Sequence, residues 1–372
     1  MKTQVSIVRC PNYETDLVWK ATQKAIELLG GITNFIPYGS SVLVKPNLLM
    51  AKEPQFGITT HPEVVRAIIR VLKEIDCKIF IGDGPSIWGG YAEDVDEVYK
   101  RSGIKDLAEE EQVELIKFHK HRWHRGFPLT TWLDTCEYLV SVPKFKTHDL
   151  TILTGAIKNL FGLVSAPYKT QLHKKYIGQE DFSHVLVDIY AETKPCLTVV
   201  DGVVAMEADG PATNGRLRSL GLILVGSDGV AIDSILATIM GLKPQDIPTT
   251  RQAAERGLGI ADLNYIEILG ERLEDIIGEP FLLPSTSITK KIPPALMEIA
   301  KGFIRFYPKL IQQNCILCQA CVKSCPEKTI RLKDGHIVID YSRCLSCFCC
   351  QEVCPTSAIR IKKSLFAKIL GL

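Results

Sequence analysis

Eight cysteines near the C-terminus follow one spacing twice. Each copy reads Cys-x2-Cys-x2-Cys-x3-Cys-Pro. The first copy comprises Cys315, Cys318, Cys321 and Cys325, and the second comprises Cys344, Cys347, Cys350 and Cys354. Every cysteine of the first copy has its counterpart 29 positions further along the chain. This regularity indicates an internal duplication of one small structural unit.

Thiolates at this spacing suit an iron–sulfur cubane, whose iron corners each take one sulfur ligand. Three cysteines of one tight loop reach three corners, and the fourth ligand comes from the other copy. We therefore expect two [4Fe–4S] clusters, one on Cys315, Cys318, Cys321 and Cys354 and one on Cys344, Cys347, Cys350 and Cys325. The alternative is a pair of zinc sites, but four-coordinate zinc gives no role to the third cysteine or to the Cys-Pro ending.

This segment, residues 311–363, resembles the bacterial two-cluster ferredoxins, and the resemblance implies one-electron transfer. Cys349 adds a ninth thiol beside Cys350. It is either a small buried residue near the cluster or a spare ligand that tunes the redox behaviour. The remaining cysteines, which we expect to be ordinary core thiols, are Cys10, Cys77, Cys136 and Cys196.

The composition is that of a globular chain of two or three domains. It has 372 residues, of which 46% are apolar and 23% charged, and a formal net charge of +2. This balance does not predict a nucleic-acid partner. Nine of 13 cysteines fall between residues 315 and 354, which indicates metal binding and not a disulfide framework. With no apolar signal region and no apolar run near the ~18 residues of a membrane span, we expect a cytoplasmic protein.

Residues 1–280 alternate short apolar runs with amphipathic helical patterns. The expected strands are 5–8, 41–45, 78–82, 138–142, 197–200, 222–225 and 265–269, and the expected helices include 17–29, 64–75 and 230–240. This alternation favours an α/β domain with a mostly parallel sheet and helices on both faces. We expect a linker with one helix (295–306) at residues 281–310, then the cysteine module at 311–363 and a tail at 364–372.

Polar residues follow several of these strands. In open α/β sheets the ligand lies outside the carboxyl ends of the strands, so these loops should converge on one crevice. Lys144, Lys146 and His148 alternate along an extended segment and so share one side of it, which favours an anion such as a phosphate or a carboxylate. A charged strand edge that deters aggregation explains the same pattern equally well.

Three further segments could contribute to the crevice. Residues 150–160 have helical periodicity, with Gly155 and Gly162 on a stripe that allows something to approach closely. His61 precedes a proline suited to the first turn of a helix, whose N-terminus could face an anion. An acidic loop with Asp201, Glu207 and Asp209 could hold a divalent cation together with Asp83, although such residues are also ordinary turn formers.

The loops together resemble the family called domain of unknown function 362, over about residues 5–270. The shared segments are Lys45-Pro46-Asn47, Thr60-His61-Pro62, Gly82-Asp83, Pro143–His148, Gly155–Gly162, Asp201-Gly202 with Met206-Glu207 and Gly210-Pro211, and Ser227-Asp228 with Asp233. Ala208-Asp209 departs from the family pattern. Members of the family often carry a C-terminal two-cluster module, and the resemblance strengthens the expectation of one crevice without implying a reaction.

We therefore expect an anionic substrate to contact Lys45, Asn47, His61, Asp83, Lys144, Lys158, Asn159, Asp201 and Glu207, with His148 and Lys146 as the catalytic residues. His148 is the candidate proton donor because its unperturbed pKa is near neutrality. The leading hypothesis is an oxidoreductase whose clusters feed electrons to this substrate. The alternatives are an electron carrier that docks a redox partner protein, and a non-redox lyase or isomerase with structural or sensing clusters. No Gly-rich dinucleotide fingerprint or Walker loop is present.

Anaerobically purified protein should contain about eight iron atoms and about eight acid-labile sulfides per chain, because each of two cubanes holds four of each. Metal analysis and sulfide analysis measure both quantities. Zinc without sulfide would instead favour the two-zinc interpretation.

Overall fold

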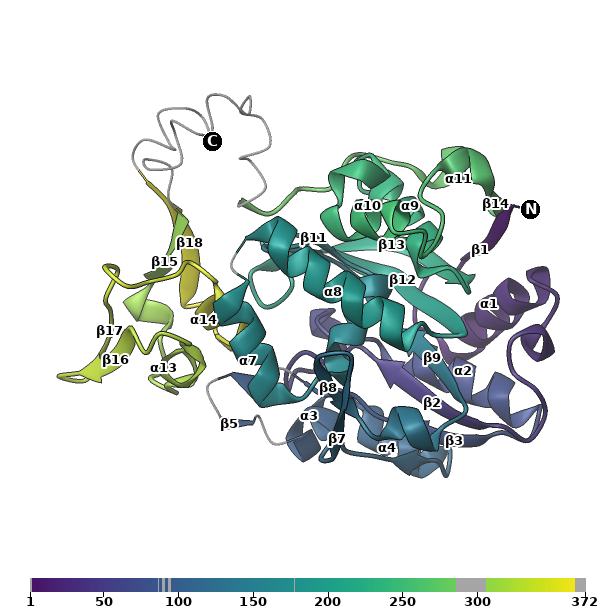
Figure 1. Ribbon diagram of the computed structural model, residues 1–372, viewed down its shortest axis with the longest axis horizontal. Helices are drawn as coiled ribbons and strands as arrows, with labels where there is room; N and C mark the ends of the chain where they lie inside the picture. The colour runs from purple at the N-terminus through teal and green to yellow at the C-terminus, as the bar shows by residue number, and fades with distance from the viewer. Residues whose placement is uncertain are drawn as a thin grey trace.

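The computed structural model describes residues 2–85, 87–88, 91–92, 95–176, 178–285 and 306–364. It consists of a large α/β domain and a small module at one end that carries the duplicated cysteines (Figure 1). In the described part of the chain, the main sheet has ten strands: β1 (Thr3–Arg9), β2 (Ser41–Pro46), β3 (Lys78–Ile81), β6 (Glu114–Leu115), β9 (Tyr138–Val142), β10 (Lys144–His148), β11 (Ile152–Thr154), β12 (Leu197–Ala208), β13 (Gly215–Gly226) and β14 (Ile266–Gly270).

The sheet is mostly parallel, as the alternating sequence pattern predicts. Its main path runs β14-β1-β13-β12-β9-β2-β3-β6, and β10 pairs with both β11 and β12. The antiparallel pairs are β1–β13, β12–β13 and β10–β11, and the remaining neighbours are parallel. Because β2, β3 and β9 run side by side in one direction, their carboxyl ends meet at one edge of the sheet.

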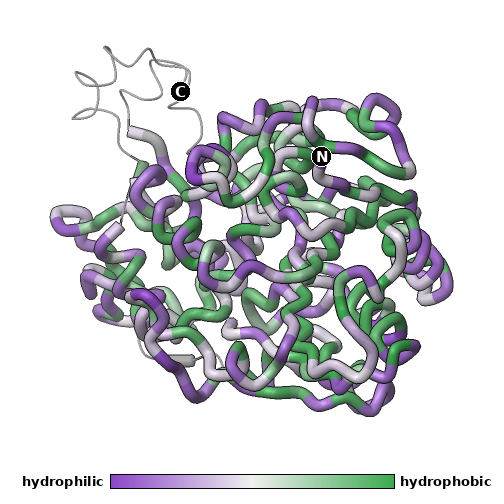
Figure 2. The backbone as a smooth tube through the Cα atoms, turned by 45° about the vertical axis from the view of Figure 1, so that its right-hand side comes forward, coloured by the Kyte–Doolittle hydropathy of each residue, from purple (hydrophilic) through white to green (hydrophobic). Residues whose placement is uncertain are grey.

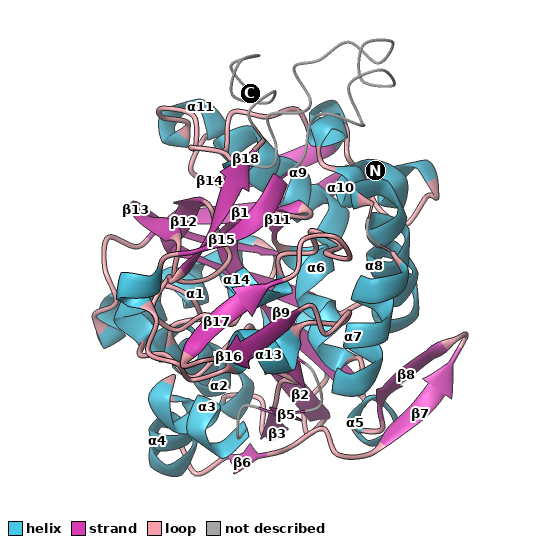
Figure 3. Ribbon diagram, turned by 90° about the vertical axis from the view of Figure 1, so that its left-hand side faces the viewer, coloured by secondary structure: helices cyan, strands magenta, loops and turns pink. Residues whose placement is uncertain are grey.

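Helices cover both faces of the sheet (Figure 3). One layer contains α1 (Thr15–Leu28), α2 (Pro62–Lys73), α3 (Val95–Arg101) and α4 (Ile104–Glu110), and the other contains α6 (Ala156–Asn159), α8 (Gln179–Thr193), α9 (Gly229–Ile239) and α10 (Pro248–Glu255). The shorter or peripheral elements are α5 (Trp132–Thr135), α7 (Ala166–Lys175), α11 (Leu273–Ile276) and the strand pairs β4 (Ile87–Trp88) with β5 (Tyr91–Ala92) and β7 (His121–His124) with β8 (Phe127–Thr130). Among the described helices, none combines the length and the apolar composition needed to cross a membrane.

Alternate residues along the strands pack into opposite helical layers. In β2, Val42 and Val44 pack with α1 and α2, whereas Leu43 packs with α8 on the other face. Figure 2 shows hydrophobic segments running through the interior of the domain and hydrophilic ones over its surface. Each fully buried aliphatic side chain contributes about 1.5–3 kcal/mol. The two-sided core therefore fixes the positions of the strand ends.

Helix α2 begins where the sequence predicts. Pro62 occupies the first turn, and the His61 side chain caps the helix, with Nδ1 accepting a hydrogen bond from the Glu63 backbone N–H at 3.2 Å. The predicted helix end near residue 75 is close to the observed end at Lys73. The strong amphipathic period of this segment is what made it predictable from the sequence.

Residues 150–160 do not form the one helix that their periodicity predicts. Ile152–Thr154 form β11, and only Ala156–Asn159 form a helix. Ile152 has a φ of 68°, which no helical path accommodates. The apolar residues of the segment are buried as expected, but a short buried strand and a buried helix produce similar apolar runs.

The acidic loop predicted after residue 200 is also not a loop. Strand β12 continues from Leu197 to Ala208, pairing with β13 over most of that length. Asp201 therefore lies in the middle of a strand, opposite Lys144 of β10. Gly202 belongs to a residue type that is common in turns, but it lies where the β12–β13 register shifts at an irregularity.

The expected linker helix falls mainly on residues 286–305 and the expected tail on 365–372, which lie outside the described residues. Residue 306 begins strand β15 (Phe306–Leu310), which pairs with β18 (Ile359–Lys363). The module thus includes residues before 311. Its other elements are α13 (Ala320–Ser324), β16 (Ile330–Lys333), β17 (His336–Ile339) and α14 (Cys349–Glu352).

The backbone of the module repeats with the sequence. Leu317, Gln319 and Lys328 have positive φ values, and so do the residues 29 positions later, which are Ser346, Phe348 and Ser357. Each half also forms a backbone N–H···S bond at the corresponding place, from Thr329 to Cys325 Sγ at 3.3 Å and from Ala358 to Cys354 Sγ at 3.2 Å. The duplication inferred from the cysteines is therefore structural.

A buried carboxylate fixes the start of α6. Asp233 of α9 accepts hydrogen bonds from the backbone N–H groups of Ala156 at 2.6 Å and Ile157 at 3.1 Å. A Cβ on Gly155 would come within 2.1 Å of its Oδ1, so only glycine lets the carboxylate approach. This contact between distant parts of the sequence places the whole Gly155–Gly162 segment.

Asp233→Ala should lower the free energy of unfolding by about 2–4 kcal/mol, because it leaves two buried N–H groups without acceptors. Asp233→Asn keeps one acceptor oxygen and should cost less. Urea titrations followed by tryptophan fluorescence measure both. Equal losses for the two variants would show that hydrogen bonding is not what Asp233 contributes.

Candidate functional site

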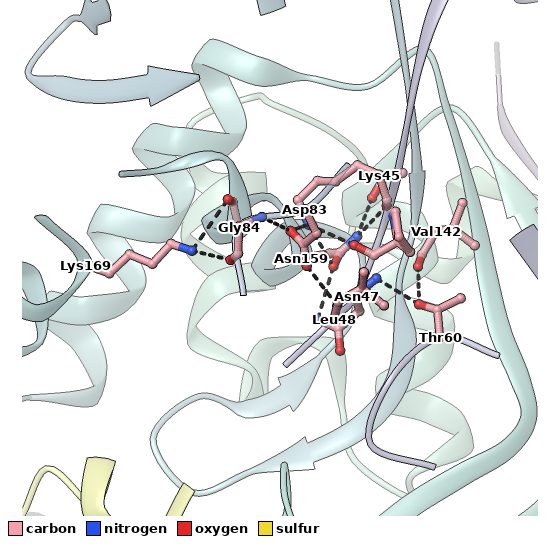
Figure 4. Close-up of polar contacts among 12 residues, drawn as sticks. Lys45, Asn47, Leu48, Thr60, Asp83, Gly84, Val142, Asn159 and Lys169 are labelled. Carbon is pink, nitrogen blue, oxygen red and sulfur yellow. Dashed lines mark hydrogen bonds and ion pairs between the residues drawn. The ribbon is translucent and has the colours of Figure 1, made fainter. Parts of the chain in front are cut away.

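The loops at the carboxyl ends of β2 and β3 are joined by a buried ion pair (Figure 4). Lys45 Nζ lies 2.7 Å from Asp83 Oδ1, and both side chains are almost fully buried. Asp83 also accepts backbone hydrogen bonds from Leu48 at 2.8 Å and Gly84 at 2.9 Å. Asp83 is thus occupied by the protein itself, and its main effect is to hold the two loops together.

Asn47 and Asn159 connect this pair to the next strand. Asn159 Oδ1 accepts from Asn47 Nδ2 at 3.2 Å and from Lys45 Nζ at 3.3 Å, while its amide donates to Ser141. Asn47 Oδ1 in turn accepts from Lys146 Nζ at 2.7 Å. The two asparagines expected to bind substrate therefore orient lysines.

A second buried ion pair lies across β10 and β12. Lys144 Nζ lies 2.9 Å from Asp201 and donates to the Tyr13 hydroxyl at 2.6 Å. The other contacts of Asp201 are the Tyr13 hydroxyl and the backbone N–H of His61, and the Tyr13 and His61 rings stack 3.7 Å apart. Lys144, His61 and Asp201 are thus brought together as predicted, but they satisfy one another.

Glycines in this region make room for the protein's own polar groups. A Cβ on Gly162 would come within 2.1 Å of Asp83 Oδ1 and 2.6 Å of Lys45 Nζ. The carbonyl of Gly84 accepts from Lys169 Nζ of α7 at 2.6 Å. The glycine stripe predicted that some group approaches the backbone closely here. The groups that do so are side chains of this protein, not a ligand.

Lys158 differs from the other lysines. We call Lys45, Lys144, Lys146, Lys158 and Lys169 the lysine cluster. In the described part of the chain, the ammonium group of Lys158 forms no hydrogen bond or ion pair, whereas each of the other four has at least one acceptor. Its side chain is only partly buried. Burial lowers its pKa to about 8, and the nearby Glu352 carboxylate opposes that change.

Glu352 reaches the lysine cluster from the cysteine module. Its Oε1 lies 3.6 Å from Nε2 of His148, and both side chains are buried. Burial raises the pKa of Glu352 to about 7, although Lys158 and Lys146 act in the opposite direction. The module thus contributes a carboxylate to a site that the α/β domain otherwise builds.

Hydrogen bonds hold the module in this position. Thr213 Oγ1 donates to the Cys354 carbonyl at 2.9 Å, and Ser357 Oγ donates to the Thr213 carbonyl at 2.9 Å. Lys52 Nζ donates to the Pro355 carbonyl at 3.0 Å, and the Asn214 amide donates to the Ile359 carbonyl at 2.9 Å. All four bonds lie on the segment that follows α14, so the position of Glu352 is well defined.

The positive charges of the cluster are crowded and desolvated. Burial, then the charges of Lys158 and Lys144, lower the pKa of Lys146 well below its usual value. Burial lowers the pKa of Lys169 to about 7, with Asp83 opposing and Lys45 adding to the effect. An anion placed among these groups would stabilise their charged forms, so the cluster is electrostatically suited to bind one.

His148 is a neutral ring in this environment. Burial and the charges of Lys158 and His173 lower its pKa well below 6.5. Its Nδ1 accepts from the Leu150 backbone N–H at 3.0 Å, so the ring hydrogen is on Nε2 and points towards Glu352. His148 is therefore placed to donate a hydrogen bond from a neutral imidazole, not from the imidazolium that its ordinary pKa suggests.

Glu207 does not join the others, and the predicted cation site does not form. Glu207 pairs with Arg216 and Arg218 on β13, while Asp209 accepts from the backbone N–H of Ser285. Across the described residues, no three His, Cys, Asp or Glu side chains converge closely enough to hold a single metal ion. The carboxylates expected to share a cation each have a separate partner.

The cysteines of the module surround two cavities. The first cavity is lined by Cys315, Cys318, Cys321 and Cys354, and the second by Cys325, Cys344, Cys347 and Cys350. These are the two crossed sets that the spacing predicts. Thiols that line a cavity without converging on one point suit a cubane better than a zinc ion. The residues present therefore fit [4Fe–4S] clusters. Cys349 is fully buried beside them, with its Sγ directed at the Cys347 carbonyl.

Sequence reasoning missed Glu352, Lys169 and His173. A signal for Glu352 exists in the duplication, because its counterpart 29 positions earlier is Lys323, which is exposed. Where one copy of the unit has an exposed basic residue and the other copy has a buried acidic residue, the two copies lie in different surroundings. Lys169 and His173 lie in α7, a polar segment with little periodicity, and nothing in the sequence indicates which side of it is buried.

The fold and site define an iron–sulfur-binding protein in which an α/β domain is joined to a ferredoxin-type module. The chain belongs to the family described as domain of unknown function (DUF362), whose model matches residues 42–238, and a 4Fe-4S dicluster domain matches residues 307–355. It is 31% identical over 268 residues to thylakoid-associated protein sll1697 of Synechocystis sp., a match that covers 70% of this chain and 81% of that protein.

Two solved structures are distantly similar. The lactate racemase apoprotein of Thermoanaerobacterium thermosaccharolyticum has 12% sequence identity and a TM-score of 0.37 over 62% of this chain. A crystal structure from Thermotoga maritima has 12% identity and a TM-score of 0.36 over 68% of this chain. The chain spans 55% and 60% of the length of these two proteins, respectively.

Two desolvated histidines should contribute acid sensitivity to the α/β domain. Burial lowers the pKa of His61 to about 4 and that of His173 to about 3, whereas both take up protons below about 6.5 once unfolded. At these two sites the unfolded chain then binds more protons, so their contribution to the free energy of unfolding should fall as the pH drops from about 6.5 to about 4. Tryptophan fluorescence reports on this domain, because all four tryptophans lie before residue 133.

The matched variant is His173→Phe. The His173 ring lies against Phe161 and Phe182, so another aromatic ring can occupy its place. Denaturant titrations at several pH values should show a weaker pH dependence for the variant than for the unmodified protein. If the two curves run parallel, burial of His173 is not a source of the acid sensitivity.

Proposed function

We propose that the protein is an iron–sulfur oxidoreductase that reduces a small anionic substrate at the lysine cluster. The position of Glu352 is the observation that carries this proposal. Glu352 lies two residues from both Cys350 and Cys354, and it faces His148 of the α/β domain. A substrate bound beside it would be next to the cysteine-lined cavities.

Lys158 is the residue that we assign to the anionic group of the substrate. Lys45 and Lys144 are neutralised by Asp83 and Asp201, and Lys146 and Lys169 are held by protein oxygens. Lys158 alone in the described part of the cluster has no acceptor, and it keeps some contact with solvent. The other lysines then act by charge and by positioning.

The hydrogen on His148 Nε2 is the one placed to reach a substrate oxygen. The backbone bond from Leu150 to Nδ1 fixes the ring orientation. Lys146, held by Asn47 and by the Ile58 carbonyl, is close enough to act electrostatically on the ring. The clusters, when bound, supply one-electron transfer. The chain's own residues would bind the anion, orient it and hydrogen-bond the charge that develops on it.

Lys158→Met and His148→Ala should each slow substrate reduction by about 100-fold, because each removes a group that contacts the developing charge. Anaerobically reduced protein is mixed with small anions and with anion-exchange fractions of host extract, and cluster reoxidation is followed by visible absorbance. Lys105→Met removes an exposed lysine of α4 and serves as the matched control.

Two outcomes would contradict the proposal. If no small molecule reoxidises the clusters, the electrons pass to another protein or take no part in the chemistry, as the two alternative hypotheses hold. If a small molecule reoxidises the unmodified protein and the Lys158 and His148 variants equally fast, the reaction takes place elsewhere. Absorbance of the oxidised variants checks that their clusters are intact.

A further inference from the structure

The formal charge of the chain is divided between its two parts. Residues 1–285 contain 30 Lys and Arg against 37 Asp and Glu, whereas residues 306–364 contain nine against four. One of these four acidic residues, Glu352, is buried against the α/β domain. The ionisable surface side chains of the module are thus mainly basic, on a protein whose larger part is acidic. Such a division favours encounter with negatively charged partners at one end of the molecule.

Exposed apolar side chains are also concentrated in the module. Of the 13 large hydrophobic residues exposed in the described chain, five belong to its 59 residues. They are Ile316, Leu317, Leu332, Val338 and Tyr341. A sixth of the described chain therefore holds more than a third of these residues, which is a feature of interaction surfaces.

Two of these residues adjoin an exposed cluster ligand. Ile316 is 63% exposed and Leu317 is 42% exposed, and they directly precede Cys318, which is the one exposed cysteine in the described chain. Ile316 and Cys318 line the first cavity together with Ile337. This cavity therefore reaches the surface beside an apolar patch.

Strand β16 brings cations to the same place. Leu332 is the cross-strand partner of Ile337, and it is 44% exposed between Arg331 and Lys333, which are exposed as well. We call the surface formed by residues 316–318 and 331–333 the Cys318 face. It combines aliphatic side chains beside a redox centre ligand with the positive charges of Arg331 and Lys333, which strand alternation directs to the outer face of the β16–β17 hairpin.

The part of the Cys318 face formed by β16 lies away from the α/β domain, and residues 316–318 are exposed to solvent. Figure 1 shows β16 and β17 on the side of the module away from the α/β domain, while α14 lies beside α7. Glu352 of α14 meets the lysine cluster. Cys318 opens the first cavity to solvent on one side, while Cys354 on its lining is held against the α/β domain by the hydrogen bond from Thr213.

We propose that the Cys318 face docks an acidic electron-carrier protein. In the encounter, one electron passes between the carrier and the cluster held by Cys315, Cys318, Cys321 and Cys354, and no bond is made or broken. Positive charge steers the acidic carrier, and the aliphatic centre excludes water from the contact. This docking does not depend on which substrate the lysine cluster binds.

The chemistry of the face favours a protein over a nucleic acid. Single-stranded nucleic acids are bound through aromatic side chains on which bases stack. The Cys318 face offers isoleucine and leucine instead, and they lie beside a redox ligand that a nucleic acid would not use. An anionic membrane also carries the charge that matches this face. Binding to lipid vesicles distinguishes a membrane from a protein partner.

The direct test is binding of a purified acidic flavodoxin to the cluster-loaded full-length protein. Calorimetry at about 20 mM and about 200 mM salt should show weaker binding at the higher concentration, as expected for opposite charges. Arg331→Glu combined with Lys333→Glu should weaken binding at low salt by about tenfold or more, and Ile316→Glu with Leu317→Glu should do the same. Visible absorbance confirms that each variant keeps its clusters.

Matched controls place equivalent changes on the α/β domain. Lys105→Glu reverses an exposed charge, and Tyr265→Glu puts a carboxylate at a side chain that is 61% exposed. Both should bind flavodoxin like the unmodified protein. Carbodiimide crosslinking followed by mass spectrometry should join carrier carboxylates to Lys333 and not to lysines of the α/β domain.

Three results would overturn the proposal. One is binding that is unchanged in both Cys318-face variants. Another is crosslinks confined to the α/β domain. The third is protein that fails to bind flavodoxin but sediments with phosphatidylglycerol vesicles in a manner that Arg331→Glu with Lys333→Glu abolishes, since the face would then serve a membrane surface.

Discussion

The removal of lysine ammonium groups from water is the constraint on which the rest of this structure depends. A buried charge is costly unless a partner of opposite sign and further hydrogen bonds accompany it. Lys45 and Lys144 meet this condition through Asp83 and Asp201, and those carboxylates also bind the backbone of neighbouring loops. The ion pairs thereby hold the strand ends in register. Lys158 has no such partner in the described chain, so its positive charge is not compensated by an ion pair.

Much of this architecture could be predicted from the sequence, and the failures have physical causes. Strand and helix periods located the sheet and α2, and the cysteine spacing predicted the two crossed sets of cysteines that line the two cavities. Residues 150–160 were mistaken for a helix because apolar runs do not distinguish a short strand from a buried helix. The start of α6 instead depends on Asp233, more than 70 residues later. Contacts at such separation leave no local pattern, and the same holds for Glu352.

The lysine cluster and the module are one structural unit. The α/β domain supplies the positive groups and the neutral ring of His148, but a carboxylate reaches them only from α14. The segment that follows α14 is fixed by hydrogen bonds from Thr213, Asn214 and Lys52. Displacement of the module would therefore expose desolvated lysines to water and separate them from Glu352. The geometry of the site is consequently set by how the α/β domain and the module fit together.

The 29-residue duplication has lost its symmetry at one informative position. A duplicated ferredoxin unit has an internal pseudo-twofold relation, and either half could in principle face the rest of the chain. Here the first half carries Lys323 on the outside and the second carries Glu352 on the inside. Exchanging the halves would bury a lysine among lysines, an arrangement with strong repulsion. The charges at these two positions thus distinguish the two sides of an otherwise symmetric module. Only the side that carries Glu352 can pack against the α/β domain.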